Sequence, residues 1–232
     1  MLLYIVRHGD PDYATDSLLP RGTAQAEAVG KHLANMGINR VFTSPLGRAI
    51  QTAEPLCRLI GKAYEIEPWI REIPTRTLAF DGKPRGVHQL PNTYLRSDGM
   101  WDWRSSEALQ HPGFEGSDLA EQTDFIIRGG ADFLERLGYK EDGDNYRILY
   151  PNEDRVALFC HGNSLRVWLS HVLKVPLHIF LASFGYTHTG VTVLQFKIND
   201  RGITAPRCLF YNDMTHLHLY GPDTDFNGVK VL

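Results

Sequence analysis

Three short apolar runs in this chain of 232 residues each end at a polar turn, and each turn opens a helical pattern. The runs and their turns are Leu2–Val6 with Arg7-His8-Gly9, Val41-Phe42 with Ser44–Arg48, and Val156–Cys160 with His161–Ser164. Repeated strand, turn and helix units predict right-handed crossovers and a mostly parallel sheet. Because parallel strands end at the same edge of a sheet, we expect the arginines and histidines of these turns to meet there.

The segments between the junctions extend this alternation. Arg21–Met36 has apolar residues at helical spacing, and Pro45–Ile60 has a proline in its first turn with Gly61 past its end, so both are expected helices. The other expected elements are strands at Asn39–Thr43, Ala63–Ile66, Gly190–Ile198 and Ala205–Tyr211, helices from Ser117-Asp118 to Leu137 and over Ser164–Val172, a short element from Pro176, and an exposed charged turn at Lys140–Asp144. The predicted fold is a three-layer α/β/α domain with a mostly parallel mixed sheet.

The periodic pattern fades between Glu72 and about Gly116, where prolines and glycines are interleaved with aromatic and basic residues. A loop-rich stretch of this length in a compact domain is usually either functional or disordered. We therefore expect one domain over residues 1–232 with an insertion, acting as a cap, at residues 73–155. Its basic residues and tryptophans either line the substrate pocket or belong to a solvated lid; they are Arg76, Lys83, Arg85, His88, Arg104, Trp101 and Trp103.

Composition excludes several classes of protein. The formal net charge of −3 argues against nucleic acid or an acidic membrane as a partner. The first apolar run is interrupted by Arg7, so it fits neither a signal peptide nor a membrane span. The odd set Cys57, Cys160 and Cys208 lacks C-x-x-C spacing, which favours buried thiols in a reducing compartment over disulfides or zinc. These features predict a cytoplasmic protein and set no oligomeric state.

The three turns, in this order, resemble those of the histidine phosphatase superfamily, also called the phosphoglycerate mutase-like family. The resemblance covers Leu2 to about Trp69 and Val156 to about Phe196. It implies the phosphoglycerate mutase-like fold and the metal-independent hydrolysis of a small phosphorylated metabolite, without a cofactor.

The resemblance also implies roles for individual residues. His8 is the expected nucleophile, which takes the phosphoryl group as a phosphohistidine that water then cleaves. Arg7 and Arg48 are the expected phosphate clamps, with His161 as a third donor. Nearby cations disfavour the imidazolium form, so the same pocket keeps His8 neutral.

Further phosphate contacts are expected beside these residues. Gly162 and Asn163 open a helix, so their backbone N–H groups are expected to point at the anion. His188 precedes a strand whose counterpart in the family approaches the site, so it is a further expected phosphate contact.

The leaving alcohol needs a proton, and the resemblance assigns its transfer to a carboxylic acid downstream of the third strand. Glu72 matches that position, whereas Glu65, Glu67 and Asp81 are alternatives. A solvated Glu72 would be deprotonated at neutral pH, so the acid role requires burial that raises its pKa.

The chain departs from the family in its first loop, where Asp10-Pro11-Asp12-Tyr13 replaces the usual Glu or Gln followed by Ser or Thr. The longer mutase motif, with an asparagine and a second glycine-rich turn, is absent between Tyr13 and Pro20, which favours a phosphatase over a mutase.

Other interpretations of these residues remain open. One is a metal site of His8, Asp10 and Asp12 with His216 and His218 paired on a strand face. A second is a catalytically silent anion-binding scaffold, although such a scaffold has no need of the intact nucleophile set. A third is a plain strand-ending turn at Arg7-His8-Gly9 in which the glycine adopts a positive φ.

Overall fold

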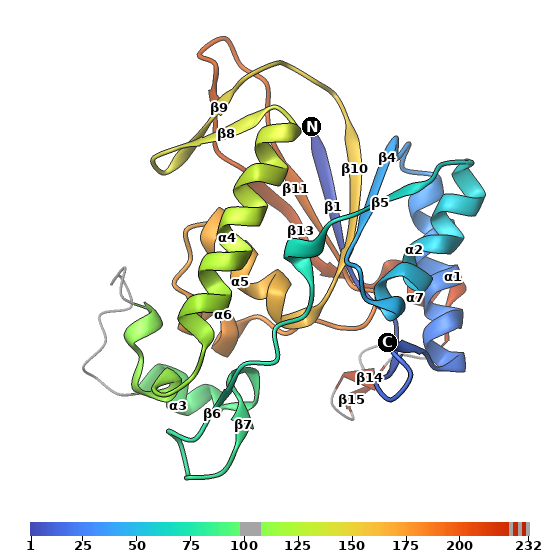
Figure 1. The fold of residues 1–232 in the computed structure, drawn as a ribbon. Helices are drawn as coiled ribbons and strands as arrows, with labels where there is room; N and C mark the ends of the chain where they lie inside the picture. Colours follow the sequence, from blue (N-terminus) through green and yellow to red (C-terminus); the bar gives the residue numbers. More distant parts are fainter. Residues whose placement is uncertain (98–107, 223–224, 227–228, 231–232) are drawn as a thin grey trace.

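The computed structural model describes residues 1–97, 108–222, 225–226 and 229–230. A six-stranded sheet lies at its centre in the order β13-β11-β1-β10-β4-β5 (Figure 1). Its strands are β1 (Leu2–Arg7), β4 (Arg40–Thr43), β5 (Tyr64–Ile66), β10 (Arg155–Cys160), β11 (Val191–Gln195) and β13 (Arg207–Asp213). β1, β10, β4 and β5 run parallel, whereas β11 is antiparallel to both β1 and β13. The predicted α/β fold with a mostly parallel mixed sheet is confirmed.

Successive residues of the central strands point to opposite faces of the sheet, and each face has its own hydrophobic cluster. On β1, Leu3 and Ile5 belong to one cluster, whereas Tyr4 and Val6 belong to the other. The helices α4 (Leu119–Arg136), α5 (Gly162–Val172) and α6 (Leu177–Ser183) pack in the first cluster, and α1 (Pro20–Ala34) and α2 (Gly47–Ile60) pack in the second (Figure 1). Helices on both faces give the predicted three layers.

Shorter elements surround this framework. They are β2 (Pro11–Asp12) paired with β3 (Ser17–Leu18), β6 (Arg76–Thr77) with β7 (Arg85–Gly86), β8 (Tyr139–Asp142) with β9 (Asn145–Ile148) and β12 (Ile203–Thr204), β14 (Asp225–Phe226) with β15 (Val229–Lys230), the helices α3 (Asn92–Ser97) and α7 (Thr215–Tyr220), and 3₁₀ turns at Pro68–Ile70, Val87–Gln89, Ala108–Gln110 and Pro112–Phe114. α7 packs against α1, and the β6–β7 ribbon lies beyond the carboxyl edge of the sheet (Figure 1).

The three junctions found in the sequence meet at that edge because the strands before them are neighbours. The backbone N–H of His8, after β1, donates to the carbonyl of Cys160 on β10 at 2.9 Å. The N–H of Ser44, after β4, donates to the carbonyl of Phe159 at 2.9 Å. Each turn is thus anchored on the neighbouring strand.

One local prediction is wrong. Lys140–Asp144 was expected to be an exposed charged turn, but β8 and β9 form a hairpin whose connection is only Gly143-Asp144. Tyr139 and Tyr146 on its two strands are buried in the main core, and this burial stabilises the pairing. A two-residue connection with glycine first, between two segments that alternate apolar and polar residues, is the sequence signal that predicts such a hairpin.

Gly129-Gly130, in the middle of α4, is explained by packing. A Cβ at Gly129 would lie 2.1 Å from Cβ of Trp69, and one at Gly130 would lie 2.2 Å from Nε1 of Trp168. Each glycine lowers the stability of the helix by about 1 kcal/mol relative to alanine, but it allows an indole ring to pack against the helix backbone.

Two of the three cysteines are the buried thiols that the composition predicts. All three cysteines are free, with Cys57 and Cys160 buried and Cys208 partly exposed. Within the described part of the chain, the helices are all too short or too polar to cross a membrane.

Candidate active site

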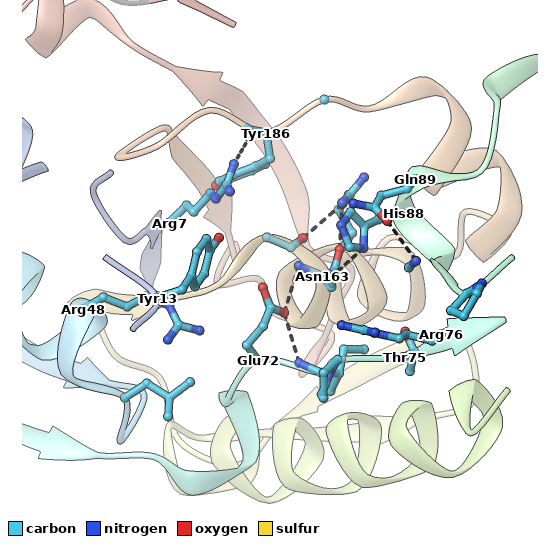
Figure 2. A pocket seen from close by; sticks show the side chains of 18 residues that line it. Arg7, Tyr13, Arg48, Glu72, Thr75, Arg76, His88, Gln89, Asn163 and Tyr186 are labelled. Atoms are coloured by element: carbon cyan, nitrogen blue, oxygen red, sulfur yellow. Dashed lines mark hydrogen bonds between the residues drawn. The ribbon is translucent and has the colours of Figure 1, made fainter. Parts of the chain in front are cut away.

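A cavity of about 1020 Å³ opens at the carboxyl edge of the sheet. Figure 2 shows Arg7, Tyr13 and Arg48 on one side of it and Arg76 and His88 on the other. The first side comes from the strand–turn–helix junctions, and the second from residues 73–89. The side chain of Glu72 lies between the two sides.

His8 is fully buried, and it follows Arg7, which lines the cavity. Its Nδ1 lies 2.7 Å from the carbonyl oxygen of Gly9, and because a carbonyl can only accept, Nδ1 carries the hydrogen. Nε2 therefore presents a lone pair, and it has no hydrogen-bond partner among the described residues. Burial, with Arg7 and His161 nearby, lowers the pKa of His8 well below its usual value. His8 is thus a neutral imidazole whose Nε2 is available as a nucleophile.

Gly9 does not adopt the positive φ that a plain turn would require. A Cβ at this position would lie 2.6 Å from the carbonyl oxygen of Gly22 on α1, so only glycine allows this approach. The N–H of Gly9 also donates to Oγ1 of Thr52 on α2 at 3.0 Å. The loop after His8 is therefore held against both helices of that layer.

The two expected phosphate clamps are each anchored through one nitrogen. Nη1 of Arg7 donates to the carbonyl of Tyr186, and Nη1 of Arg48 donates to a carboxylate oxygen of Asp16. The Nε atoms of both arginines are buried and have no partner among the described residues. The Tyr13 ring centroid lies 5.4 Å from Cζ of Arg48. Each guanidinium is thus fixed while part of its donor set stays free.

His161 is oriented by Ser44, a residue for which the sequence analysis predicts no role. Oγ of Ser44 accepts the N–H of Leu46 at 3.3 Å and lies 2.6 Å from Nε2 of His161. The hydroxyl proton has no other acceptor among the described residues, so it is donated to Nε2 and the imidazole hydrogen resides on Nδ1. Nδ1 is unpartnered within the described chain, and the ring centroids of His161 and His8 are 5.1 Å apart.

The pKa of His161 is lowered well below its usual value by burial and by Arg48 and Arg7. Ser44 precedes Pro45 at the end of a strand, which is the signal that could have marked it as a site residue. His161 therefore offers a neutral N–H donor beside His8.

Glu72 is held by the N-terminus of α5. Its Oε1 accepts the N–H groups of Ile73, Asn163 and Ser164 at 3.1, 3.2 and 3.3 Å. A proton on the carboxyl group must therefore reside on Oε2, which faces the Arg7 and Tyr13 side of the cavity in Figure 2. Burial raises the pKa of Glu72 in spite of these N–H groups and the nearby arginines. Glu72 can thus act as a proton donor above the usual pH range of a glutamate.

The other candidate carboxylates lie outside the lining of the cavity. Buried Glu67 pairs with Arg136 at 2.6 Å and accepts Nε1–H of Trp69 at 2.8 Å. Asp81 pairs with Arg85 at 2.6 Å on the exposed β6–β7 connection, and Glu65 is mostly exposed. Of the four candidates, Glu72 is the one that lines the cavity.

His188 lies beside the nucleophile. Its ring centroid is 5.6 Å from that of His8, and its Nδ1 lies 3.6 Å from a carboxylate oxygen of Asp10. Burial, with Arg7 and Arg21, lowers the pKa of His188 to about 3. His188 is therefore a neutral neighbour of His8 and is not part of the cavity lining.

Asn163 differs in role from the expected anion contact, because its N–H is engaged by Glu72. Its side chain connects two further cavity residues: Oδ1 accepts from Nη2 of Arg166 at 2.8 Å, and Nδ2 lies 3.1 Å from Nδ1 of His88. Arg166 was missed from the sequence, although it lies one helical turn after Gly162 and so on the same side of α5. Gly162 lines the cavity next to Arg7.

The alternative metal ligands are dispersed. His216 and His218 lie on α7 and not on a strand, and buried His216 has its Nε2 3.0 Å from Oγ1 of Thr189. Across residues 1–97, 108–222 and the two short C-terminal pairs, histidine, cysteine, aspartate and glutamate side chains form no group of three suited to a metal ion.

The basic residues of the loop-rich stretch separate into two groups. Arg76 and His88 line the cavity, whereas Lys83 and Arg85 do not. Trp101, Trp103 and Arg104 lie outside the described residues.

Comparisons with known proteins identify the family of this chain. The family model of the histidine phosphatase superfamily (branch 1) matches residues 3–207. Among curated relatives, a probable phosphoglycerate mutase GpmB of Photorhabdus laumondii is 32% identical over 185 residues, and one of Proteus mirabilis is 27% identical over 185 residues. Each alignment covers 76% of this chain and 76% of the relative.

Solved structures share the fold. A phosphoserine phosphatase of Entamoeba histolytica in complex with 3-phosphoglyceric acid superposes with a TM-score of 0.61 at 18% identity, over 93% of this chain and 98% of that one. A mycobacterial glucosyl-3-phosphoglycerate phosphatase in complex with VO3 gives 0.60 at 22% identity, over 92% and 99%. The matched region contains all three junctions and the helices that position them, so this chain belongs to branch 1 of the histidine phosphatase superfamily.

Proposed function

We propose that this protein is a metal-independent phosphatase that hydrolyses a small phosphate monoester through a phosphohistidine on His8. Four buried polar atoms without hydrogen-bond partners among the described residues carry the proposal: Nε of Arg7, Nε of Arg48, Nδ1 of His161 and Nε2 of His8. Buried polar groups are otherwise almost always paired. Three of the four are donors suited to phosphoryl oxygens, and the fourth is a lone pair suited to phosphorus.

The proposed reaction has two steps. In the first, the Nε2 lone pair of His8 forms a bond to phosphorus, the ester P–O bond breaks, and the proton on Oε2 of Glu72 goes to the leaving alcohol. In the second, water attacks phosphorus while Glu72 takes one of its protons, and the N–P bond breaks to release phosphate and neutral His8. Arg7, Arg48 and His161 stabilise charge on the phosphoryl oxygens in both steps.

Residues 73–155 are proposed to act as the cap of this site. The part of this segment that lines the cavity includes Thr75, Arg76, Gly86 and His88. The junctions after the strands hold the phosphoryl group. The separate cap segment can therefore determine which alcohol portion of a substrate fits the cavity.

The test is the release of phosphate from p-nitrophenyl phosphate in the presence of EDTA. The native protein should be active, and acid quenching during turnover should trap an acid-labile phosphate on the protein. His8→Ala should lose both activity and trapped phosphate, whereas His171→Ala, at a histidine outside the cavity, should keep them. Full activity of His8→Ala, or loss of native activity on chelation, would refute the proposal.

A mutase is the second candidate, because curated relatives are named probable phosphoglycerate mutases. A mutase holds the phosphohistidine long enough to return the group to a substrate. Interconversion of 2- and 3-phosphoglycerate that is stimulated by a bisphosphate, together with slow hydrolysis, would favour it over the phosphatase.

A further inference from the structure

The side of the cavity away from Arg7 and Arg48 carries a second set of cationic and donor groups (Figure 2). Arg76 comes from β6, His88 from the turn after β7, and Arg166 from α5. Arg76 has no ion-pair partner among the described residues. Glu72 is the single carboxylate among the described lining residues, and its held oxygen is committed to backbone N–H groups. This side of the cavity therefore has a surplus of positive charge.

The donor hydrogens of this set can be placed from the contacts of Asn163. Its Oδ1 accepts from Nη2 of Arg166, which fixes the amide so that Nδ2 donates to Nδ1 of His88. The hydrogen of neutral His88 is therefore on Nε2. Arg166 also donates from Nε to the carbonyl of Gly162 at 3.1 Å, which leaves its Nη1 without a partner in the described chain. Both side chains are thus held in place with one donor to spare.

Thr75 supplies an independent observation. Its side chain lines the same part of the cavity, the residue is 1% exposed, and its Oγ1 has no hydrogen-bond partner among the described residues. A buried unpaired hydroxyl costs roughly 1–3 kcal/mol, so its presence at the wall of a cavity points to a polar group of a ligand.

The position of Glu72 relates the two sides. A phosphoryl group bound between Arg7 and Arg48 would have its ester oxygen near Glu72, which lies between the two sides, and the alcohol would then extend toward Arg76 and Arg166. The cavity of about 1020 Å³ lies at the upper end of the range of about 300–1000 Å³ that encloses small ligands, so a phosphoryl group fills only part of it.

We infer that the alcohol of the substrate carries a second acidic group, a carboxylate or a second phosphate, bound by Arg76, Arg166 and Nε2–H of His88, with the Thr75 hydroxyl as a further donor. Guanidinium groups suit both anions because their paired N–H groups match two oxygens. The inference rests on the proposed phosphatase function and names its substrate class.

The test compares esters that differ in the second acidic group alone. One pair is 3-phosphoglycerate and glycerol 3-phosphate, and another is O-phosphoserine and O-phosphoethanolamine, each with and without a carboxylate. Fructose 1,6-bisphosphate and fructose 6-phosphate differ by a phosphate. In the carboxylate pairs or in the phosphate pair, the ester with the second acidic group should have a kcat/KM about 10- to 100-fold higher than its partner. Hydrogen bonds to a charged group are expected to contribute this factor. The type that shows the preference distinguishes a carboxylate from a phosphate.

Variants locate the preference. Arg76→Gln, at an exposed residue without an ion-pair partner in the described chain, should remove most of the preference for the doubly anionic ester. Arg85→Gln is the matched control, because Arg85 lies on the paired strand β7 and outside the cavity. It should keep the full preference.

The outcomes separate this inference from the function on which it rests. Equal kcat/KM within every pair, with p-nitrophenyl phosphate hydrolysed, would overturn the second-anion site and leave the phosphatase intact. A preference that survives Arg76→Gln would also overturn it, whatever the result for Arg85→Gln. Failure of the native protein to hydrolyse any of these esters would instead count against the proposed function.

Discussion

Replacement of Glu72 by glutamine tests whether this side chain is the proton donor. The amide of E72Q would keep the held oxygen, which accepts three backbone N–H groups at 3.1–3.3 Å, so the position of the side chain should not change. The substitution removes only the proton that Oε2 delivers to the leaving group. General acid catalysis contributes about 10²- to 10⁴-fold, or about 2.7–5.4 kcal/mol of barrier.

The loss of kcat/KM in E72Q should depend on the leaving group of the ester, so the assay compares two esters. An alkoxide is a poor leaving group and needs the proton, whereas p-nitrophenolate leaves without one. The value of kcat/KM reports the steps up to P–O cleavage, so E72Q should lose about 10²- to 10⁴-fold on an alkyl phosphate and less than about tenfold on p-nitrophenyl phosphate. Equal losses on both esters would refute the role of Glu72 as the acid.

The pH dependence of kcat/KM has an expected direction on each side of the optimum. Activity requires neutral His8, whose pKa is lowered, and protonated Glu72, whose pKa is raised. For the native protein, kcat/KM on the alkyl ester should therefore fall as pH rises through the raised pKa of Glu72. On the acid side, kcat/KM should fall only at a pH below the usual pKa range of histidine, because the pKa of His8 is lowered. E72Q should lack the alkaline decline.

E67Q is the matched control, because it makes the same change at a carboxylate outside the cavity. Buried Glu67 pairs with Arg136 and accepts Nε1–H of Trp69. Removal of this charge should lower the free energy of unfolding by about 1–3 kcal/mol in urea titrations and leave the ratio of the two kcat/KM values unchanged. A changed leaving-group dependence in E67Q would contradict the assignment.

Three other predictions concern orientation, packing and protonation. Ser44→Ala removes the hydroxyl that fixes the tautomer of the His161 imidazole, so kcat should fall about 10- to 100-fold. Circular dichroism should show an unchanged fold, and a wild-type kcat would exclude this orienting role. Gly129→Ala places a Cβ 2.1 Å from Cβ of Trp69 and should cost about 1–3 kcal/mol in urea unfolding, so an unchanged midpoint would contradict the packing argument. Burial lowers the pKa of His216 to about 4, so the unfolded imidazole takes up a proton below about pH 6.5 while the folded one stays neutral. The contribution of His216 to the free energy of unfolding, which is full above pH 6.5, should fall by about 3 kcal/mol toward pH 4. On acidification a His216→Gln protein should therefore lose about that much less than the native protein, and an equal loss would disprove this source.

The sequence was informative wherever chemistry is encoded in local pattern. Apolar runs that end in polar turns predicted β1, β4 and β10, and proline and glycine marked the ends of α2. The order of the turns identified the family, which the family model confirms. The roles assigned to His8 and Arg48 stay predictions, now with a geometry that supports them.

Prediction failed where long-range packing decides the structure. Lys140–Asp144 is polar in sequence, yet β8 and β9 pair because Tyr139 and Tyr146 are buried in the main core. The two glycines of α4 weaken the helical pattern in the sequence, and only the positions of Trp69 and Trp168 explain them.

The sequence alone determined the fold class and the kind of chemistry, because periodicity and a short nucleophile motif depend on neighbours in the chain. Tertiary structure decided which carboxylate can donate a proton and which cations share the cavity. Glu67 and Glu72 are five positions apart and chemically identical, but one is paired with Arg136 and the other is held at the N-terminus of α5. The pKa and the role of an ionisable group follow from burial and from partners distant in sequence, and these exist only once the chain has folded.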